Sequence, residues 1–277
     1  MTEWKLPDAC DFDGRAVRYG VSGDGPPVVV VHGTPWSSFN FRHIIKALSQ
    51  DFTVHYYDLI GYGQSDKSPG DVSLGIQNQV LDRLLDHWQL DSPSIIGHDF
   101  GGATVLRTHL INGRDFDKIV LIDPVAVAPW GSSFFQHVRS HEAAFAGVPD
   151  YIHEAIVRAY VKTAAFKPIN DATLESIVRP WTEPDGKGAF YRQMAQANSG
   201  YTDEVQPLYA RISRPVLILW GREDTWIPLE RGEALRDMIP GSSFHVIPDA
   251  GHLVIEEQPD QLMKKIHPFI HTEFSQF

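Results

Sequence analysis

The stretch Ser94-Ile-Ile-Gly-His-Asp-Phe-Gly-Gly102 decides the fold. It passes from a short apolar segment into a helical one, and its centre has the form G-x-Nu-x-G, with Asp99 in the nucleophile position. The flanking glycines leave room for a strained turn that lifts the central side chain above the end of a strand. The helix that follows favours a negative charge at its N-terminus. An aspartate that only caps this helix is the alternative interpretation.

Strand and helix patterns alternate on both sides of this turn. Four consecutive valines predict a strand buried on both faces, and other short β-branched or apolar runs are typical of neighbouring strands. The predicted strands lie at 28–31, 52–57, 94–97 and 118–122, and the predicted helices between them at 39–48, 74–88 and 100–111. This alternation predicts an α/β protein with a mostly parallel, doubly wound sheet.

The pattern changes after residue 124. Between 125 and 205 no strand is predicted, and helical stretches alternate with proline and glycine. Those helices are predicted at 133–145, 151–163, 172–178 and 189–197, after which strands resume at 216–220 and 243–247 and a last helix lies near 258–274. We therefore predict a core of residues 1–124 and 206–277, with a helical cap of residues 125–205 inserted after the sixth strand.

Composition excludes several classes of protein. The 277 residues carry a net charge of −11, from 35 acidic and 24 basic residues, and no basic cluster points to nucleic acid. No apolar stretch approaches 18 residues, and the N-terminus lacks the pattern of a signal peptide. A single cysteine, Cys10, excludes a disulfide framework and any cysteine-based metal site. We expect a cytoplasmic protein that acts on a small molecule; its oligomeric state is left open.

Four landmarks resemble the α/β-hydrolase family, and within it the branch of epoxide hydrolases and haloalkane dehalogenases that uses an aspartate nucleophile. The first three are the His32–Pro35 segment after the valine strand, the glycine-rich loop Gly61-Tyr-Gly-Gln-Ser-Asp66, and the turn around Asp99. The fourth is the pair Gly221-Arg-Glu-Asp224 and Ala250-Gly-His252. The resemblance implies the α/β-hydrolase fold.

The same resemblance implies a catalytic triad. Asp99, Asp224 and His252 follow one another in the order nucleophile, acid and base, each just beyond a predicted strand. Such strand ends are where open α/β sheets bind ligands. Asp123 is the rival acid, because some dehalogenases that resemble this chain carry their acid at that position.

A carboxylate nucleophile narrows the chemistry. Attack on an acyl carbon would give an anhydride, whereas attack on a saturated carbon gives an alkyl ester of Asp99. His252 would then activate a water that cleaves this ester. The resemblance places the oxyanion donors at the backbone N–H groups of Thr34 and Phe100. No metal or organic cofactor is required, so the expected partners are a small hydrophobic organic substrate and water.

The leaving group separates two substrates. An opening epoxide needs a proton, usually from a tyrosine, and the cap segment Gly188–Arg192 resembles the one that carries such a residue, which makes Tyr191 the candidate acid. A second tyrosine is left open among Tyr151, Tyr160 and Tyr201. A departing halide instead needs N–H donors, and Phe100 replaces the tryptophan that usually supplies one.

Two tryptophans, Trp36 and Trp130, are the candidate N–H donors of the substrate pocket. Epoxide hydrolysis is favoured narrowly over haloalkane dehalogenation. A ligand-binding protein without activity, a serine-type esterase and a cofactor-free oxygenase are more remote alternatives, because a complete triad is present and no other G-x-Ser-x-G occurs.

Overall fold

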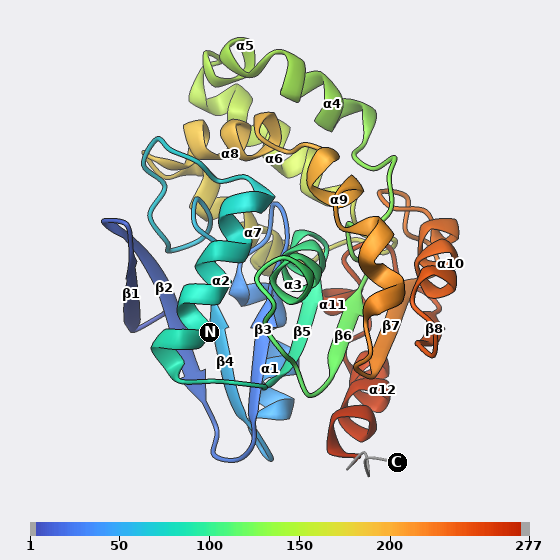
Figure 1. Ribbon diagram of the computed structural model, residues 1–277. Helices are drawn as coiled ribbons and strands as arrows, with labels where there is room; N and C mark the ends of the chain where they lie inside the picture. Colours follow the sequence, from blue (N-terminus) through green and yellow to red (C-terminus); the bar gives the residue numbers. More distant parts are fainter. Residues whose placement is uncertain (1–3, 273–277) are drawn as a thin grey trace.

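The computed structural model describes residues 4–272, which form one eight-stranded sheet covered by helices (Figure 1). The strands are β1 (Asp8–Phe12), β2 (Arg15–Ser22), β3 (Pro27–Val31), β4 (Thr53–Tyr57), β5 (Ser94–His98), β6 (Ile119–Ile122), β7 (Val216–Gly221) and β8 (Ser243–Ile247). Their order across the sheet is β1-β2-β4-β3-β5-β6-β7-β8. All pairs from β4 to β8 are parallel, so the predicted α/β fold is confirmed.

The first two strands were not predicted. They pair antiparallel with each other, and β2 pairs antiparallel with β4. Asp13 and Gly14 join them with φ of 51° and 80°, the left-handed conformation at both central positions that a tight hairpin needs. The Asp-Gly dipeptide was the available signal. Because of this hairpin, the valine strand is the third strand of the chain and β6 is the sixth.

The central strands form the core. Val28 to Val31 are at most 1% exposed, which agrees with a strand covered on both faces. The core helices are α1 (Arg42–Leu48), α2 (Leu74–Trp88), α3 (Phe100–Leu110), α10 (Leu229–Met238), α11 (Val254–Glu257) and α12 (Pro259–His271), with short 3₁₀ helices η1 (Ser38–Phe41) and η2 (Gln206–Arg211). Helices α2 and α3 pack together in front of the sheet in Figure 1, and α1 packs against α12.

The cap follows β6, as predicted, and lies above the edge of the sheet (Figure 1). Its helices are α4 (Ser133–Ser140), α5 (Glu142–Ala146), α6 (Asp150–Lys162), α7 (Asp171–Thr182), α8 (Gly186–Ala195) and α9 (Gly200–Asp203). The helix predicted at 133–145 is broken at His141, whose φ and ψ of −139° and 35° are not helical. The last predicted helix ends at His271, and residues 273–274 lie outside the described range.

Between residues 4 and 272, no helix is both long enough and apolar enough to cross a bilayer.

Candidate active site

Asp99 occupies a strained turn between β5 and α3. Its φ of 54° and ψ of −120° lie outside the regions that a non-glycine residue usually adopts. Close packing allows the turn only with glycine nearby, since a Cβ on Gly101 would collide with the carbonyl oxygen of Val31 and one on Gly33 would collide with the Asp99 carboxylate. No side-chain capping bond from Asp99 to α3 is formed. The conformation therefore presents the carboxylate to the site instead of using it as a helix cap.

The two oxygens of the Asp99 carboxylate have different surroundings. Oδ1 accepts a 2.6 Å hydrogen bond from the backbone N–H of Thr34, and Oδ2 lies 3.2 Å from Nε2 of His252. Phe100 is the first residue of α3, where backbone N–H groups have no partner within the helix. One oxygen is thus held by an amide, whereas the other faces the imidazole.

His252 and Asp224 form the rest of the chain of polar groups. Nδ1 of His252 lies 2.8 Å from Oδ2 of Asp224, whose Oδ1 accepts the backbone N–H groups of Trp226 and Ile227 at 2.8 and 2.9 Å. These bonds fix the carboxylate, and the carboxylate fixes the ring. His98 adds a further anchor, since its Nε2 donates to the carbonyl oxygen of His252 at 2.9 Å.

Two carboxylates flank the imidazole of His252 and change its pKa. Burial lowers the pKa of its imidazole, but the carboxylates of Asp224 and Asp99 outweigh that effect and hold the pKa well above its usual value. The ring is fully buried, and the indole of Trp226 stacks on it with centroids 5.2 Å apart. The imidazolium is therefore stabilised between two acids.

Asp123 does not bond to His252. It follows β6 with a φ of 39°, and its Oδ1 accepts the backbone N–H of Gly221 at 2.8 Å. Its buried Oδ2 has no hydrogen-bond partner in the part of the chain that the structure describes. Burial, and then the nearby Asp224, raise the pKa of its carboxyl well above the usual value. Of the two acids that the sequence left open, the structure pairs Asp224 with the histidine.

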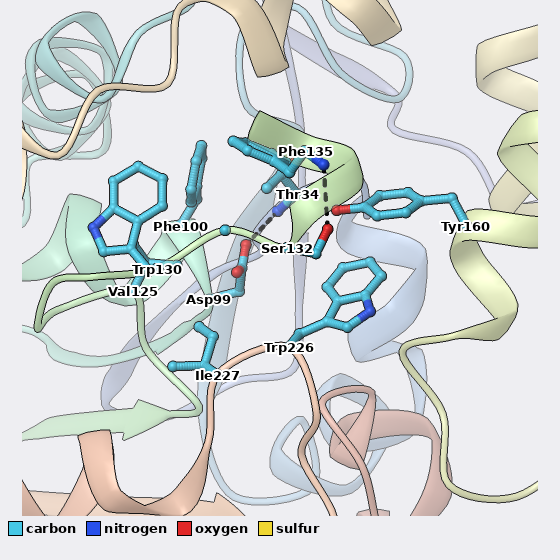
Figure 2. Close-up of a pocket in the computed structure, with 11 residues that line it drawn as sticks. Thr34, Asp99, Phe100, Val125, Trp130, Ser132, Phe135, Tyr160, Trp226 and Ile227 are labelled. Atoms are coloured by element: carbon cyan, nitrogen blue, oxygen red, sulfur yellow. Dashed lines mark hydrogen bonds between the residues drawn. The ribbon is translucent and has the colours of Figure 1, made fainter. Parts of the chain in front are cut away.

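A small pocket opens above Asp99 (Figure 2). Its walls come from the turn, the acid loop and the cap; they are Thr34, Asp99, Phe100, Val125, Trp130, Gly131, Ser132, Phe135, Tyr160, Trp226 and Ile227. The free volume is about 20 Å³, enough for roughly one water molecule. Side chains of the core and of the cap thus close over Asp99 with little free space between them.

Tyr160 and Ser132 place hydroxyl groups in this pocket. Figure 2 shows the Tyr160 hydroxyl pointing toward that of Ser132, beside Asp99. The Ser132 hydroxyl accepts the backbone N–H of Phe135 at 3.2 Å. Burial, followed by the charge of Asp99, raises the pKa of Tyr160, so its phenol keeps its proton.

Tyr191 lies elsewhere. Its hydroxyl is buried and lies 2.9 Å from Nδ1 of His153. Because Nε2 of the same ring donates to the carbonyl oxygen of Trp181, Nδ1 is the unprotonated nitrogen and accepts a hydrogen bond from the Tyr191 hydroxyl. Tyr191 is absent from the pocket wall. The segment resemblance that singled it out cannot tell which face of a cap helix points to Asp99, and Tyr160 on α6 occupies the pocket instead.

The two predicted tryptophans differ. Trp130 lines the pocket, but its indole N–H donates to Thr202 at 3.0 Å and is not available to a substrate. Trp36 is buried behind the wall, stacked on Trp226 at 5.7 Å, and its Nε1 has no hydrogen-bond partner within residues 4–272. Trp226 was missed from the sequence, although its place two residues after Asp224 was a signal that it borders the site.

Comparison with known proteins places the chain in the alpha/beta hydrolase family, whose model matches residues 28–265. The chain is 44% identical to an alpha/beta hydrolase fold protein from Burkholderia ambifaria, with a TM-score of 0.93 over 95% of this chain and 98% of that one. It is 28% identical to the uncharacterized hydrolase YugF of Bacillus subtilis, over 88% of this chain and 89% of the relative. A 2-hydroxy-6-oxo-2,4-heptadienoate hydrolase of Pseudomonas putida is also 28% identical, over 91% of both chains. The protein is an α/β-hydrolase.

Proposed function

We propose that the protein hydrolyses epoxides through a covalent ester of Asp99. The observation that carries this proposal is the Asp99 carboxylate at the strained turn, with one oxygen on the Thr34 amide and the other beside His252. An acyl-transfer mechanism at this turn would use a serine or cysteine nucleophile, and position 99 holds neither. A carboxylate nucleophile is suited to attack on a saturated carbon that carries a leaving group.

In the first step Oδ2 of Asp99 attacks an epoxide carbon, because Oδ1 is held by Thr34. The C–O bond of the ring breaks, and the departing oxygen takes the phenol proton of Tyr160. The hydroxyl of Ser132, toward which Tyr160 points, would donate a hydrogen bond to the resulting phenolate. The product of this step is a hydroxyalkyl ester of Asp99.

In the second step water attacks the ester carbonyl. Esterification removes the Asp99 charge that helps to raise the pKa of His252, so the imidazole becomes a base when it is needed. The oxyanion forms at Oδ1, which already accepts the N–H of Thr34, and the N–H of Phe100 at the start of α3 would be the second donor. The imidazolium that took the water proton returns it to the leaving alkoxide as the ester collapses to a diol, and the new carboxylic acid of Asp99 gives its proton to the Tyr160 phenolate. His252 then regains from solvent the proton that it lost on esterification.

We expect Tyr160→Phe to lower the kcat for epoxide hydrolysis by about 10²- to 10⁴-fold, the usual contribution of a positioned proton donor. The steady-state formation of diol from a styrene-oxide-type substrate measures this. The matched control is Tyr191→Phe, which removes a hydroxyl bonded to His153 outside the pocket and should retain far more activity. The reverse ranking would assign the acid to Tyr191.

We expect Asp224→Asn to lower kcat by about 10⁴-fold, because the histidine loses the acid that orients it. Asp123→Asn should be much less harmful, since Asp123 makes no bond to His252. Measuring diol formation by both variants, alongside their melting temperatures, separates catalysis from folding. Equal losses in two stably folded variants would mean that the two acids act together.

Dehalogenation is the second candidate function. One observation favours it: the buried indole N–H of Trp36, which has no partner among residues 4–272, is a donor that a halide leaving group could use after a small shift of Trp226. Within the pocket wall itself, however, the indole groups of Trp130 and Trp226 donate to Thr202 and Thr163. The hydroxyl of Tyr160 is a proton donor suited to an alkoxide, which is why epoxides are preferred.

A further inference from the structure

We propose a zinc-type metal site formed by Asp51, His267 and His271, at the opposite edge of the sheet from Asp99. The sequence predicted no metal site. Asp51 stands two residues before β4, and the two histidines lie one turn apart on α12. The chain separates Asp51 from His267 by 216 positions, so only the fold brings the three side chains together.

The geometry fits a small metal ion. The three potential ligand atoms all lie within 4.8 Å of one another. Nε2 of His267 is 2.9 Å and Nε2 of His271 is 3.9 Å from the same Oδ2 of Asp51. Bonds of about 2.0 Å in a tetrahedron separate ligand atoms by about 3.3 Å, a value between these two distances. Small side-chain rotations would therefore complete the site.

The donor set selects the class of metal. Two imidazoles and one carboxylate suit Zn²⁺, and also Ni²⁺ or Cu²⁺, whereas Mg²⁺ and Ca²⁺ prefer oxygen ligands throughout. Asp51 forms ion pairs with both histidines, but only His267, at 2.9 Å, is within hydrogen-bond distance, whereas His271 is 3.9 Å away. A metal ion would engage both rings, whose centroids are 4.4 Å apart.

The surroundings leave the site open but ordered. The side chains of His267, His271 and Asp51 are 40%, 46% and 47% exposed, so an ion can reach them directly and water can fill the remaining position. The ring of Phe52 packs on that of His271 at 4.7 Å and limits its rotation. Because Asp51 precedes the strand and Asp99 follows one, the ion would join α12 to the core and would not reach the hydrolytic site.

The test is zinc binding by tag-free protein, since a histidine tag would compete for the metal. We expect titration calorimetry to show one Zn²⁺ per chain, and zinc to raise the melting temperature by several degrees. Mg²⁺ should have no such effect. Asp51→Asn and His271→Gln should lose both the binding and the shift, while melting in metal-free buffer as the parent protein does or within a few degrees of it.

His141→Gln is the matched control. His137 and His141 are also one turn apart, with ring centroids 4.7 Å apart, but within the described chain they belong to no three-ligand cluster. This variant should keep the zinc response. No binding by the parent protein at 1 mM Zn²⁺ (about the weakest affinity a useful site would have), or the same response in every variant, would overturn the proposal. Neither outcome depends on which reaction the hydrolase catalyses.

Discussion

Asp99→Asn is expected to abolish turnover, with kcat reduced by about 10⁵- to 10⁶-fold, as when the nucleophile of a triad is removed. The amide keeps the shape of the carboxylate and can still accept the Thr34 N–H, so the turn should survive. It cannot, however, displace an alkoxide or a halide. The measurement is product formation from an epoxide panel and a haloalkane panel, with melting temperature as the check on folding.

The control for this variant is Asp13→Asn. Asp13 has a φ of 51°, close to the 54° of Asp99, but lies exposed in the hairpin between β1 and β2. The variant therefore shows how an aspartate-to-asparagine exchange at a positive φ affects folding when the residue has no catalytic role. Full activity of a folded Asp99→Asn protein would mean that Asp99 is only a structural residue of the turn, and the ester mechanism would be abandoned.

The parallel strands could be predicted from the sequence because the signal for each one, a short run of apolar residues, lies within a few consecutive positions. A run such as Val28–Val31 has no polar residue to place in water, so it must be covered on both faces. The glycine pattern around Asp99 likewise constrains the backbone within a few residues. Because parallel strands end at one edge of the sheet, the order Asp99, Asp224, His252 was enough to predict that they meet.

The lining of the pocket could not be predicted in the same way. It depends on which faces of the cap helices turn toward Asp99, and that is set by contacts between segments far apart in sequence. Tyr160 and Tyr191 both lie on amphipathic cap helices, yet one borders the pocket and the other bonds to His153. The partner of Trp130, Thr202, is 72 residues away and could not be inferred from either local segment.

His252→Gln is expected to stop the reaction after its first step and to leave the alkyl ester on Asp99. Loss of the base should lower kcat by about 10⁶-fold, while the attack of Asp99 does not require it. Intact-protein mass then reports the substrate class directly. An epoxide adds its whole mass, whereas an alkyl halide adds its mass less that of the hydrogen halide. Peptide mapping should place the adduct on Asp99.

The double variant Asp99→Asn/His252→Gln isolates the site of the adduct, because it lacks both the nucleophile and the base. It should gain no mass with any substrate that labels His252→Gln. Label that persists in the double variant would have to reside on another carboxylate, and Asp224 or Asp123 would then be mapped next. Labelling by epoxides but not by halides would favour the Tyr160 hydroxyl as the leaving-group donor, because only an opening epoxide needs a proton from it. Labelling by halides alone would instead direct attention to the free indole of Trp36.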